Sequence, residues 1–309
     1  MVIFMYFIMT IDVESFSIPL NKLDYDTGRR VSTEGLPLLL DILAKYDVKG
    51  TFYFTGEMAE NFPESLELVL EYDHEIGCHS YSHTLDRALD NLSYTEQLSE
   101  IGRAKNIIER IAGKIESFRA PMLRINKDTV KILELLEFKS DSSIASQRFD
   151  GLLTFGSMKK LGWLVAPRRP YFLSYESPIK SGNSNVLEIP ISALIFPYIG
   201  TFMRASPNLF KILQKLLFIE SKITDKPIVF LFHPNECLDV QASKVMTTRR
   251  ARNIIEYIFA DFIRQRIKLK NLGKASLKLL NEVLYTTRKY EFEFICIKDY
   301  RKRFRDRRG

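Results

Sequence analysis

The sequence predicts an α/β fold in which a parallel sheet, covered by helices, closes into a barrel. Short apolar runs alternate with longer amphipathic stretches along nearly the whole chain, which is the pattern of strands linked by helices. The 309 residues are a length that α/β barrels often use as one unit, and no Pro/Gly/Ser-rich linker divides them. We therefore expect a single domain over residues 1–300, followed by a basic tail over residues 301–309.

Seven apolar runs have the length and composition of buried strands. They cover residues 3–9, 51–54, 75–78, 115–118, 186–189, 228–232 and 292–297. Helical patterns cover residues 35–46, 95–112, 127–137 and 247–288, the last expected to break near Gly273. Ser32 and Thr33 are plausible caps of the first helix, which has Pro37 in its first turn. The irregular segment 151–185, which contains several prolines, is expected to cap the functional site.

The composition is that of an ordinary globular protein, with 46% hydrophobic and 27% charged residues. The apolar opening run is far shorter than the roughly 20 residues that cross a bilayer, and it lacks the flanks of an export signal. We expect it to form a buried first strand and the protein to be cytoplasmic. The three cysteines, Cys78, Cys237 and Cys296, are too scattered for a disulfide framework or a thiolate metal site.

The positive charge is concentrated near the C-terminus. Residues 244–309 carry 19 basic and 7 acidic side chains, whereas residues 1–243 carry 26 and 31. A solvated tail is the favoured interpretation. The sharper alternative is a surface that attracts an anionic membrane or a phosphate-bearing substrate, so that the protein lies peripherally at the membrane. Nucleic acid is not expected as a partner, because no recognised binding motif accompanies the charge.

Two histidines, His79 and His83, directly follow one of the predicted strands. If the chain turns into a helix there, the i, i+4 spacing places both imidazoles on one face, within reach of a single metal ion. Alone, such a pair is more often two ordinary surface histidines. The polar residues at the ends of the other predicted strands make a metal site the favoured interpretation.

Asp12 and Glu14 end the first apolar run, where one carboxylate could complete a His/His/carboxylate metal site while the other acts as a base. Arg119 ends another run, and a guanidinium beside a carboxylate keeps it ionised. Further polar groups at strand ends are Asp141, Glu188 and His233. Each has an ordinary explanation as a cap, a turn or a surface ion pair. Together they occupy the edge at which α/β barrels assemble active sites.

The order of these motifs resembles the polysaccharide deacetylases, the NodB-homology group of carbohydrate esterase family 4, in its Asp-Val-Glu branch. The matching stretches, in the order of the family, are residues 10–14, 50–56, 74–83, 118–121, 141–144, 188–190 and 232–234. The resemblance implies a distorted (β/α) barrel and the hydrolytic removal of an acyl group from an amide nitrogen, typically on an N-acetylated sugar.

The resemblance also implies roles for single residues. His79 and His83 would bind the divalent metal, Asp12 would be the general base, Arg119 its tether and His233 the general acid.

Many members of the family have a second aspartate as a metal ligand where this chain has Val13, so we assign the third ligand to Glu14. The sequence leaves open which of Asp12 and Glu14 is ligand and which is base.

Substrate contacts are expected from three further positions, Met122, Asp141 and Glu188, with the backbone amide of Met122 helping to hold the oxyanion. Zn²⁺ is the expected metal because two imidazoles and a carboxylate with an open position suit it, although Fe, Co or Ni could use the same ligands. The expected substrate is an N-acylated sugar or glycan. An amidase or deformylase acting on a small or lipid-linked amide, and a non-catalytic carbohydrate-binding protein, are the alternatives.

The segment 193–202 is unusually apolar and is expected to be core. If it instead forms a surface near the site, it would suit a sugar carried on a lipid phosphate.

Overall fold

The protein is described by a computed structural model that covers residues 5–149, 157–240, 245, 248–251 and 253–306. Its main sheet has the strand order β12-β1-β4-β5-β6-β7-β9-β8, and β13 also pairs with β1. The strands are β1 (Tyr6–Val13), β4 (Thr51–Phe54), β5 (Glu75–Cys78), β6 (Ser117–Phe118), β7 (Ser140–Asp141), β8 (Tyr171–Phe172), β9 (Leu187–Glu188), β12 (Ile228–Phe232) and β13 (Glu293–Phe294). Every pair is parallel except β8 with β9.

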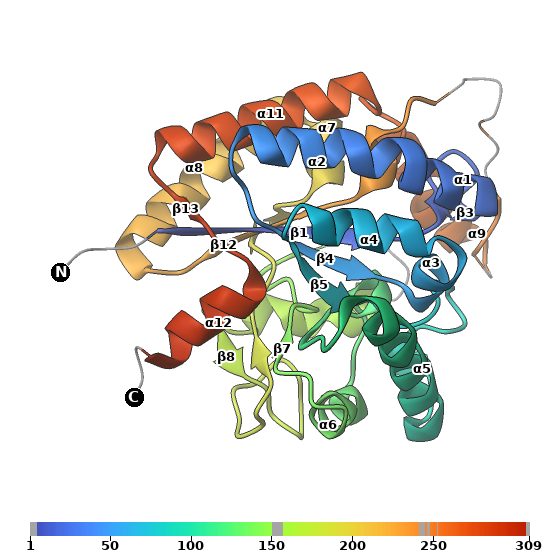
Figure 1. Ribbon diagram of the computed structural model, residues 1–309, viewed down its shortest axis with the longest axis vertical. Coiled ribbons are helices and arrows are strands. Elements are labelled where there is room, and N and C mark those ends of the chain that lie inside the picture. Colours follow the sequence, from blue (N-terminus) through green and yellow to red (C-terminus); the bar gives the residue numbers. More distant parts are fainter. Residues whose placement is uncertain (1–4, 150–156, 241–244, 246–247, 252, 307–309) are drawn as a thin grey trace.

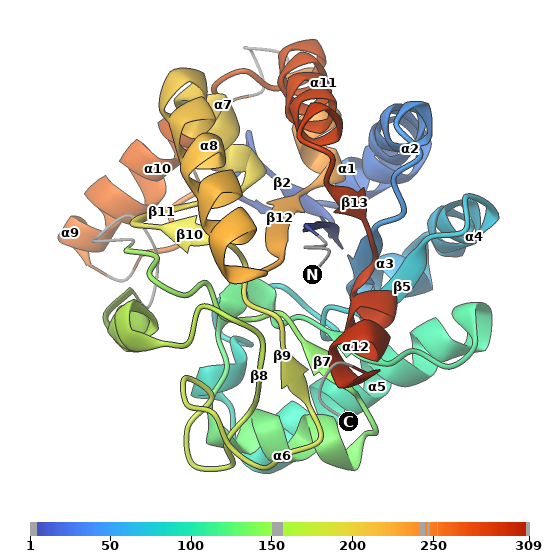
Figure 2. The ribbon, with the colours of Figure 1, turned by 90° about the vertical axis from the view of Figure 1, so that its left-hand side faces the viewer.

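The sheet is curled, and its two sides approach each other beyond β9. The backbone N–H of Ser192, which follows β9, donates to the carbonyl of Val229 in β12 at 3.1 Å. Ile199 forms a further parallel bridge with Leu231 of the same strand. In Figure 2, β12, β5, β7 and β9 follow the resulting curve. The expected distorted (β/α) barrel is confirmed.

The helices lie mainly outside this sheet (Figure 1). They are α1 (Tyr25–Arg30), α2 (Leu36–Lys45), α3 (Gly56–Asn61), α4 (Pro63–Glu71), α5 (Tyr94–Ala112), α6 (Lys127–Leu135), α7 (Gly200–Ala205), α8 (Pro207–Thr224), α9 (Ile254–Glu256), α10 (Arg264–Lys268), α11 (Lys274–Lys289) and α12 (Ile297–Asp306). Both views show α2, α11 and α8 on the same side of the molecule. Within the described residues, no helix is both long enough and apolar enough to cross a membrane.

Shorter elements complete the fold. Two small antiparallel hairpins pair β2 (Phe16–Ser17) with β3 (Lys22–Leu23) and β10 (Ala193–Leu194) with β11 (Phe196–Pro197). Short 3₁₀ segments cover Leu89–Asn91, Pro121–Leu123 and Pro234–Cys237, and a longer one covers Ser157–Val165. π-Helical segments cover Val31–Gly35 and Tyr257–Ile263.

The side chains of β1 alternate between two hydrophobic clusters, which fixes the direction of Asp12. Phe7, Met9, Ile11 and Val13 belong to the larger cluster, while Tyr6 and Ile8 belong to a second cluster that also contains residues of β9 and β12. Because successive side chains of a strand point to opposite faces, Asp12 lies on the same face as Tyr6 and Ile8. The strand therefore presents a carboxylate inside the curled sheet, near its carboxyl edge.

Three of the expected strands, at 51–54, 75–78 and 228–232, have the predicted bounds. The first strand continues to Val13, which the polar residues Thr10 and Asp12 obscured in the sequence. The expected strand at 292–297 is wrong in extent, because only Glu293–Phe294 pair and a helix begins at Ile297. That helix includes residues 301–306 of the predicted basic tail.

Two helix predictions also need correction. The first helix begins at Tyr25, where Asp24 accepts a hydrogen bond from the N–H of Thr27, so Ser32 and Thr33 lie within helical backbone and are not caps. The expected helix at 247–288 begins only at Ile254. Its break at Gly273 is confirmed, since that residue has a φ of +63°, which favours glycine.

Candidate active site

Asp12 is held by Arg119 at the carboxyl edge of the sheet. The guanidinium Nη1 donates to Asp12 Oδ1 at 2.8 Å, and the Nε and Nη2 atoms donate to the backbone and hydroxyl oxygens of Ser142, each at 2.8 Å. The guanidinium also lies over the ring of Tyr53, 4.5 Å from its centre. Arg119 is fully buried. Its side chain therefore has a single fixed orientation toward Asp12.

The charges around Asp12 keep it ionised. Burial alone would raise the pKa of this carboxyl, but the charges of Arg119, His79 and His233 outweigh burial and lower the pKa below its usual value of 3.8. The second carboxylate oxygen, Oδ2, lies 3.7 Å from Nε2 of His79 and 4.0 Å from Nε2 of His233. Asp12 is thus a carboxylate with one oxygen tethered and the other directed between two imidazoles.

Glu14, His79 and His83 form the candidate metal centre. One ligand atom from each residue can be chosen so that all three lie within 4.8 Å of one another. Nε2 of His83 lies 3.1 Å from Oε2 of Glu14, and the two imidazole centres are 5.5 Å apart. The structure therefore brings together the three residues that the sequence suggested as ligands, and Asp12 lies beside them.

The route by which the two histidines meet differs from the prediction. Residues 79–84 are not helical, and Ser80 has a φ of +58°. The loop is held by hydrogen bonds from the N–H groups of Gly56 and Glu57 to the carbonyls of Ser80 and Tyr81. The i, i+4 spacing brings the rings together through this turn and not through a helix.

A hydrogen bond orients the ring of His79, and burial keeps the ring of His83 neutral. Nδ1 of His79 lies 2.8 Å from the carbonyl oxygen of Arg119. Because a carbonyl only accepts, Nδ1 is the donor in this contact, and Nε2 is the nitrogen that faces the cluster. Burial lowers the pKa of His83 to about 4, against the opposing charge of Glu14, so this ring is neutral at pH 7. A neutral imidazole is the form that coordinates metals.

The buried atoms of this cluster fit a divalent ion. Within the described chain, Glu14 Oε2 and His79 Nε2 are buried without a hydrogen-bond partner. Buried polar atoms are rarely left unsatisfied. Two imidazoles and one carboxylate are a donor set that catalytic Zn²⁺ sites use, with a further position open.

His233 follows β12, and its Nδ1 lies 2.9 Å from Oε1 of Glu236. Burial would lower the pKa of His233, but the hydrogen bond and charge of Glu236, together with Glu14 and Asp12, raise the pKa above 6.5. Glu236 is in turn held by the fully buried Arg204, whose Nε donates to Oε2 at 2.5 Å. His233 is therefore biased toward its protonated form.

Glu236 and Arg204 are the site residues that the sequence analysis missed. Glu236 had a usable signal, since it follows His233 by three residues in a 3₁₀ turn. A Cβ at Gly200 would lie 2.5 and 2.7 Å from the two carboxylate oxygens of Glu236, so only glycine fits beside them. Arg204 lies between apolar segments and carries no pattern that distinguishes it from a surface arginine.

The expected substrate contacts of Asp141 and Glu188 need correction. Both side chains are completely buried, and neither lines the cavity beside the metal cluster. Asp141 Oδ1 accepts a hydrogen bond from Ser143, and Glu188 Oε1 accepts one from the N–H of Ile144. A substrate cannot reach side chains that are enclosed within the sheet. Asp141 and Glu188 instead stabilise, from inside, the strands that carry Arg119 and Ser142.

Met122 lies where expected, although its amide has a partner in this structure. It has a φ of +55°, and its N–H donates to Nε2 of His83 at 3.2 Å. The ammonium of Lys160 donates to the carbonyl of Met122 at 2.8 Å. Lys160 belongs to the long loop that we expected to cap the site, whose residues 151–156 lie outside the described residues.

A cavity of about 100 Å³ opens beside these groups. Its lining includes Asp12, Glu14, His83 and His233, together with Met122, Leu123, Arg148, Lys160, Ile199, Thr201, Leu231, Arg264 and Lys268. The candidate base, two of the three candidate ligands and the candidate acid therefore share one open space.

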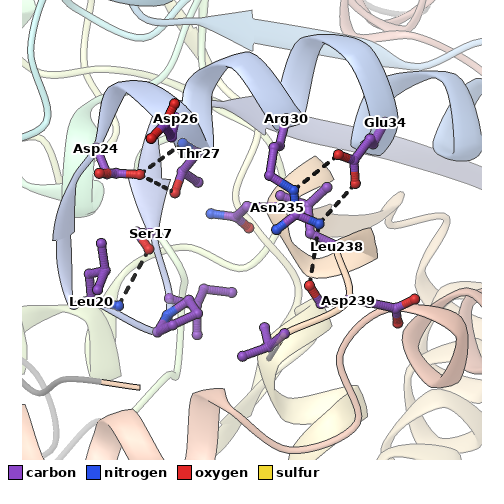
Figure 3. A pocket seen from close by; sticks show the side chains of 13 residues that line it. Ser17, Leu20, Asp24, Asp26, Thr27, Arg30, Glu34, Asn235, Leu238 and Asp239 are labelled. Atoms are coloured by element: carbon purple, nitrogen blue, oxygen red, sulfur yellow. Dashed lines mark hydrogen bonds and ion pairs between the residues drawn. The ribbon is translucent and has the colours of Figure 1, made fainter. Parts of the chain in front are cut away.

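A larger cavity of about 680 Å³ lies between the segment 17–20, helix α1 and the segment 235–240 (Figure 3). Its polar groups are engaged with one another: Asp24 accepts from Thr27, and Arg30 donates to Glu34 and to the carbonyl of Asp239. None of the metal-cluster residues lines it. The smaller cavity is therefore the candidate active site.

Comparison with known proteins agrees with this fold and with the predicted family resemblance. Residues 20–140 match the family model for polysaccharide deacetylase. The chain is 35% identical over 111 residues to a peptidoglycan-N-acetylglucosamine deacetylase of Bacillus cereus, a match covering 35% of this chain and 38% of the relative. It is 37% identical over 91 residues to the peptidoglycan-N-acetylmuramic acid deacetylase PdaC of Bacillus subtilis, covering 29% and 18%. The resemblance to polysaccharide deacetylases is confirmed.

The solved structure of a probable polysaccharide deacetylase from Pseudomonas aeruginosa PAO1 has a similar fold over nearly the whole chain. Its TM-score is 0.61 at 14% sequence identity, and the superposition covers 96% of this chain and 90% of that one. This likeness supports the NodB-type barrel. The sequence matches are shorter, since the chain spans less than half the length of the curated relatives it matches.

Proposed function

We propose that the protein is a metal-dependent hydrolase that removes an N-acetyl or other N-acyl group from an amino sugar. The observation that carries the proposal is the placement of Asp12 beside the Glu14–His79–His83 cluster, with His233 facing the same carboxylate oxygen. The relatives named above, deacetylases of peptidoglycan sugars, support the N-acyl sugar as the substrate class.

Asp12 is the general base of the proposed reaction, and Glu14 is the third metal ligand. Oδ2 of Asp12 faces His79 and His233, where it can take a proton from the attacking water. Arg119 keeps Asp12 ionised and fixes its other oxygen. Glu14 instead lies 3.1 Å from His83 with an unsatisfied buried oxygen, which suits a ligand. We base this proposed division of roles between the two carboxylates on their different partners.

His233 is the proposed general acid. The departing amine needs a proton, and the raised pKa of His233 keeps one available near neutral pH. Glu236 holds Nδ1, which directs Nε2 toward Asp12 and the cavity. The backbone N–H of Met122 borders the same space and can donate to a developing oxyanion after it leaves His83.

A divalent ion held by Glu14, His79 and His83 would polarise the acyl carbonyl and acidify the attacking water. Zn²⁺ is the proposed metal, with Fe, Co and Ni as alternatives for the same donor set.

The test is acetate and formate release from N-acetyl- and N-formyl-glucosamine oligomers by protein of measured metal content. The proposal expects one metal per chain and release that stops in His79→Ala. Preference for the formyl substrate would identify a deformylase. Stoichiometric metal without release from either substrate, or sugar binding that needs no metal, would instead point to a non-catalytic carbohydrate-binding protein.

A further inference from the structure

Helix α8 is apolar on two opposite faces. Its inner face packs in the core through four buried side chains: Phe210, Leu213, Leu217 and Phe218. Its outer face carries a row of five aliphatic side chains that are 46% to 77% exposed: Leu209, Ile212, Leu216, Ile219 and Ile223. Their spacings of three and four residues align them along one side of the helix, and we call them the outer row. A helix that is apolar all round is normally buried, yet no described part of the chain covers this row.

Lysines flank the outer row. The other exposed residues of α8 are Asn208, Lys211, Lys215 and Lys222, so none of them is acidic. Lys215 and Lys222 lie four and three positions from Ile219, which places their side chains beside the row. Lys211 pairs with Glu282 of α11 at 2.9 Å, whereas Lys215 and Lys222 pair with no carboxylate among the described residues. The helix therefore presents aliphatic groups and free ammonium groups together.

The one carboxylate of α8, Glu220, does not neutralise these lysines, because it is already engaged. Nε of Arg168 donates to Glu220 Oε1 at 2.7 Å, and Nζ of Lys226 donates to Oε2 at 3.1 Å. Nη1 of Arg168 also donates to the carbonyl of Ala193 at 2.7 Å. Arg168 therefore connects α8 to the β10–β11 hairpin.

The β10–β11 hairpin extends the apolar surface beside α8. It packs against this helix, and Figure 2 shows the two side by side. Its turn exposes three apolar side chains: Leu194, Ile195 and Phe196. The expectation that the segment 193–202 is core is therefore wrong for these three residues. Exposed apolar groups that adjoin one another in this way mark a surface that binds a partner or a membrane.

We propose that the outer row of α8, with Lys215 and Lys222, binds the surface of an anionic lipid bilayer. A helix that lies in the plane of a bilayer places its apolar side at the boundary of the acyl chains. Lysines at the edge of that side extend their ammonium groups to the headgroups, where anionic lipids attract them. The proposal concerns this surface alone and does not rest on the proposed function.

Charge makes a second copy of the chain a poorer occupant than lipid. Two outer rows packed together would bring the lysines of both copies close to one another, and the exposed residues of α8 include no carboxylate to pair with them. Like charges that face each other oppose association. Anionic headgroups instead supply the charge that the helix lacks.

The first experiment measures sedimentation of the full chain with vesicles of phosphatidylcholine, alone or mixed with phosphatidylglycerol. Wild type should bind the mixed vesicles, bind phosphatidylcholine far more weakly, and lose affinity as salt is added. Leu216→Gln should weaken binding roughly tenfold, because one aliphatic side chain no longer leaves water. The control is Leu135→Gln, which changes an exposed leucine of α6, a helix that both views show far from α8.

The charge is tested separately from the apolar row. Lys215→Gln combined with Lys222→Gln should weaken binding to the mixed vesicles roughly 30-fold, the effect of two lysines near an anionic surface. Binding to phosphatidylcholine alone should not change. Lys127→Gln, which changes an exposed lysine of α6, is the control and should bind as wild type does.

A fluorescent label reports whether the outer row itself enters the bilayer. The three native cysteines are buried, so Ile219→Cys and Leu135→Cys each offer one exposed thiol for a polarity-sensitive dye. Mixed vesicles should shift the emission of the dye to shorter wavelength at position 219 and leave it unchanged at position 135.

Two results would overturn the proposal. One is an absence of binding by wild type to the mixed vesicles, or equal binding by wild type and Leu216→Gln. The other is a dimer in sedimentation equilibrium without lipid that Leu216→Gln dissociates and Leu135→Gln retains, because a second copy would then cover the outer row.

Discussion

The carbonyl oxygen of Arg119 lies 2.8 Å from Nδ1 of His79, while the guanidinium of the same residue lies 2.8 Å from Asp12. One residue therefore orients both a candidate metal ligand and the candidate base. The two contacts come from different parts of Arg119, the backbone and the side chain, so mutation can separate them.

Arg119→Gln should impair Asp12 as the general base and leave metal binding intact. Without the guanidinium, burial dominates and the pKa of Asp12 rises, because burial is the largest influence on this carboxyl. The acidic limb of the kcat profile should move to higher pH, and kcat at pH 7 should fall roughly 100-fold. Metal content should stay at the wild-type level, since the contact to His79 is through the backbone.

Arg103→Gln is the control for this change, because Arg103 is exposed and pairs with Glu60. Removing one partner of a buried ion pair also costs roughly 3–5 kcal/mol of folding free energy, so unfolding by urea should be measured beside activity. An unchanged pH profile in folded, metal-loaded Arg119→Gln would remove Asp12 from the role of base.

Glu236→Gln should shift the basic limb of the pH profile. The charge of Glu236 helps to raise the pKa of His233, so the substitution lowers that pKa and His233 loses its proton at a lower pH. We expect about a tenfold loss of kcat at pH 8 and partial recovery near pH 6. Glutamine keeps an oxygen for Arg204, which limits the structural damage.

A uniform loss of activity across the pH range would mean that Glu236 only supports the local structure. Glu34→Gln is the control, because Glu34 lies on the surface and pairs with Arg30. It should leave both limbs of the profile in place.

The strands, and the edge of the sheet at which the candidate active site lies, could be predicted from the sequence for a physical reason. β4, β5 and β12 are buried along their whole length or nearly so, and their apolar runs end where the polar edge begins. Asp12, His79, Arg119 and His233 all lie at or just beyond strand ends, so the parallel arrangement alone brings them together. For these residues, the local sequence pattern predicts the same location that the folded structure shows.

Other features depend on contacts that no local pattern records. β7 and β9 have only two residues each, and their pairing comes from neighbours in the sheet. Asp141 and Glu188 look like further polar strand ends in the sequence, yet both are enclosed. The partnership of Arg204 with Glu236 spans 32 residues and is fixed by packing against Gly200.

The cytoplasmic location and the peripheral membrane contact remain predictions from sequence. The single domain over residues 1–300 is likewise a prediction from sequence.

Removal of the metal should destabilise the protein, and this effect should depend on the proposed ligands Glu14, His79 and His83 and not on a histidine elsewhere. Excess chelator should lower the Tm of wild type, because a ligand that binds only the folded state stabilises it by mass action. His83→Ala should have a low metal content and show no such shift. The control is His74→Ala, since His74 packs on Phe52 and accepts from the N–H of Gly50, away from the cluster.

His74→Ala should therefore lower the Tm yet retain the metal and the response to chelator. If His83→Ala binds metal as wild type does, Glu14 and His79 alone would have to hold it and the proposed ligand set would be wrong. The measurement is metal analysis by mass spectrometry beside thermal unfolding with and without chelator.

The buried pair Asp141 and Glu188 should make the fold less stable as pH rises. Burial raises the pKa of Asp141 to about 6, and burial together with the charge of Asp141 raises that of Glu188 well above 4.5. A carboxyl whose pKa is raised by folding binds more protons in the folded state, so its stabilising effect is present at low pH and lost as pH rises through the folded pKa. For Asp141 the loss begins near pH 4 and extends past pH 6.

Glu188→Gln should reduce this loss, because an amide cannot ionise beside Asp141. The free energy of unfolding in urea, measured at pH 5 and pH 8, should fall less with pH in Glu188→Gln than in wild type. Glu67→Gln, which removes an exposed carboxylate from α4, should keep the wild-type dependence. If both variants follow the wild-type curve, the pair does not share a proton and each carboxyl must find its neutralising charge elsewhere.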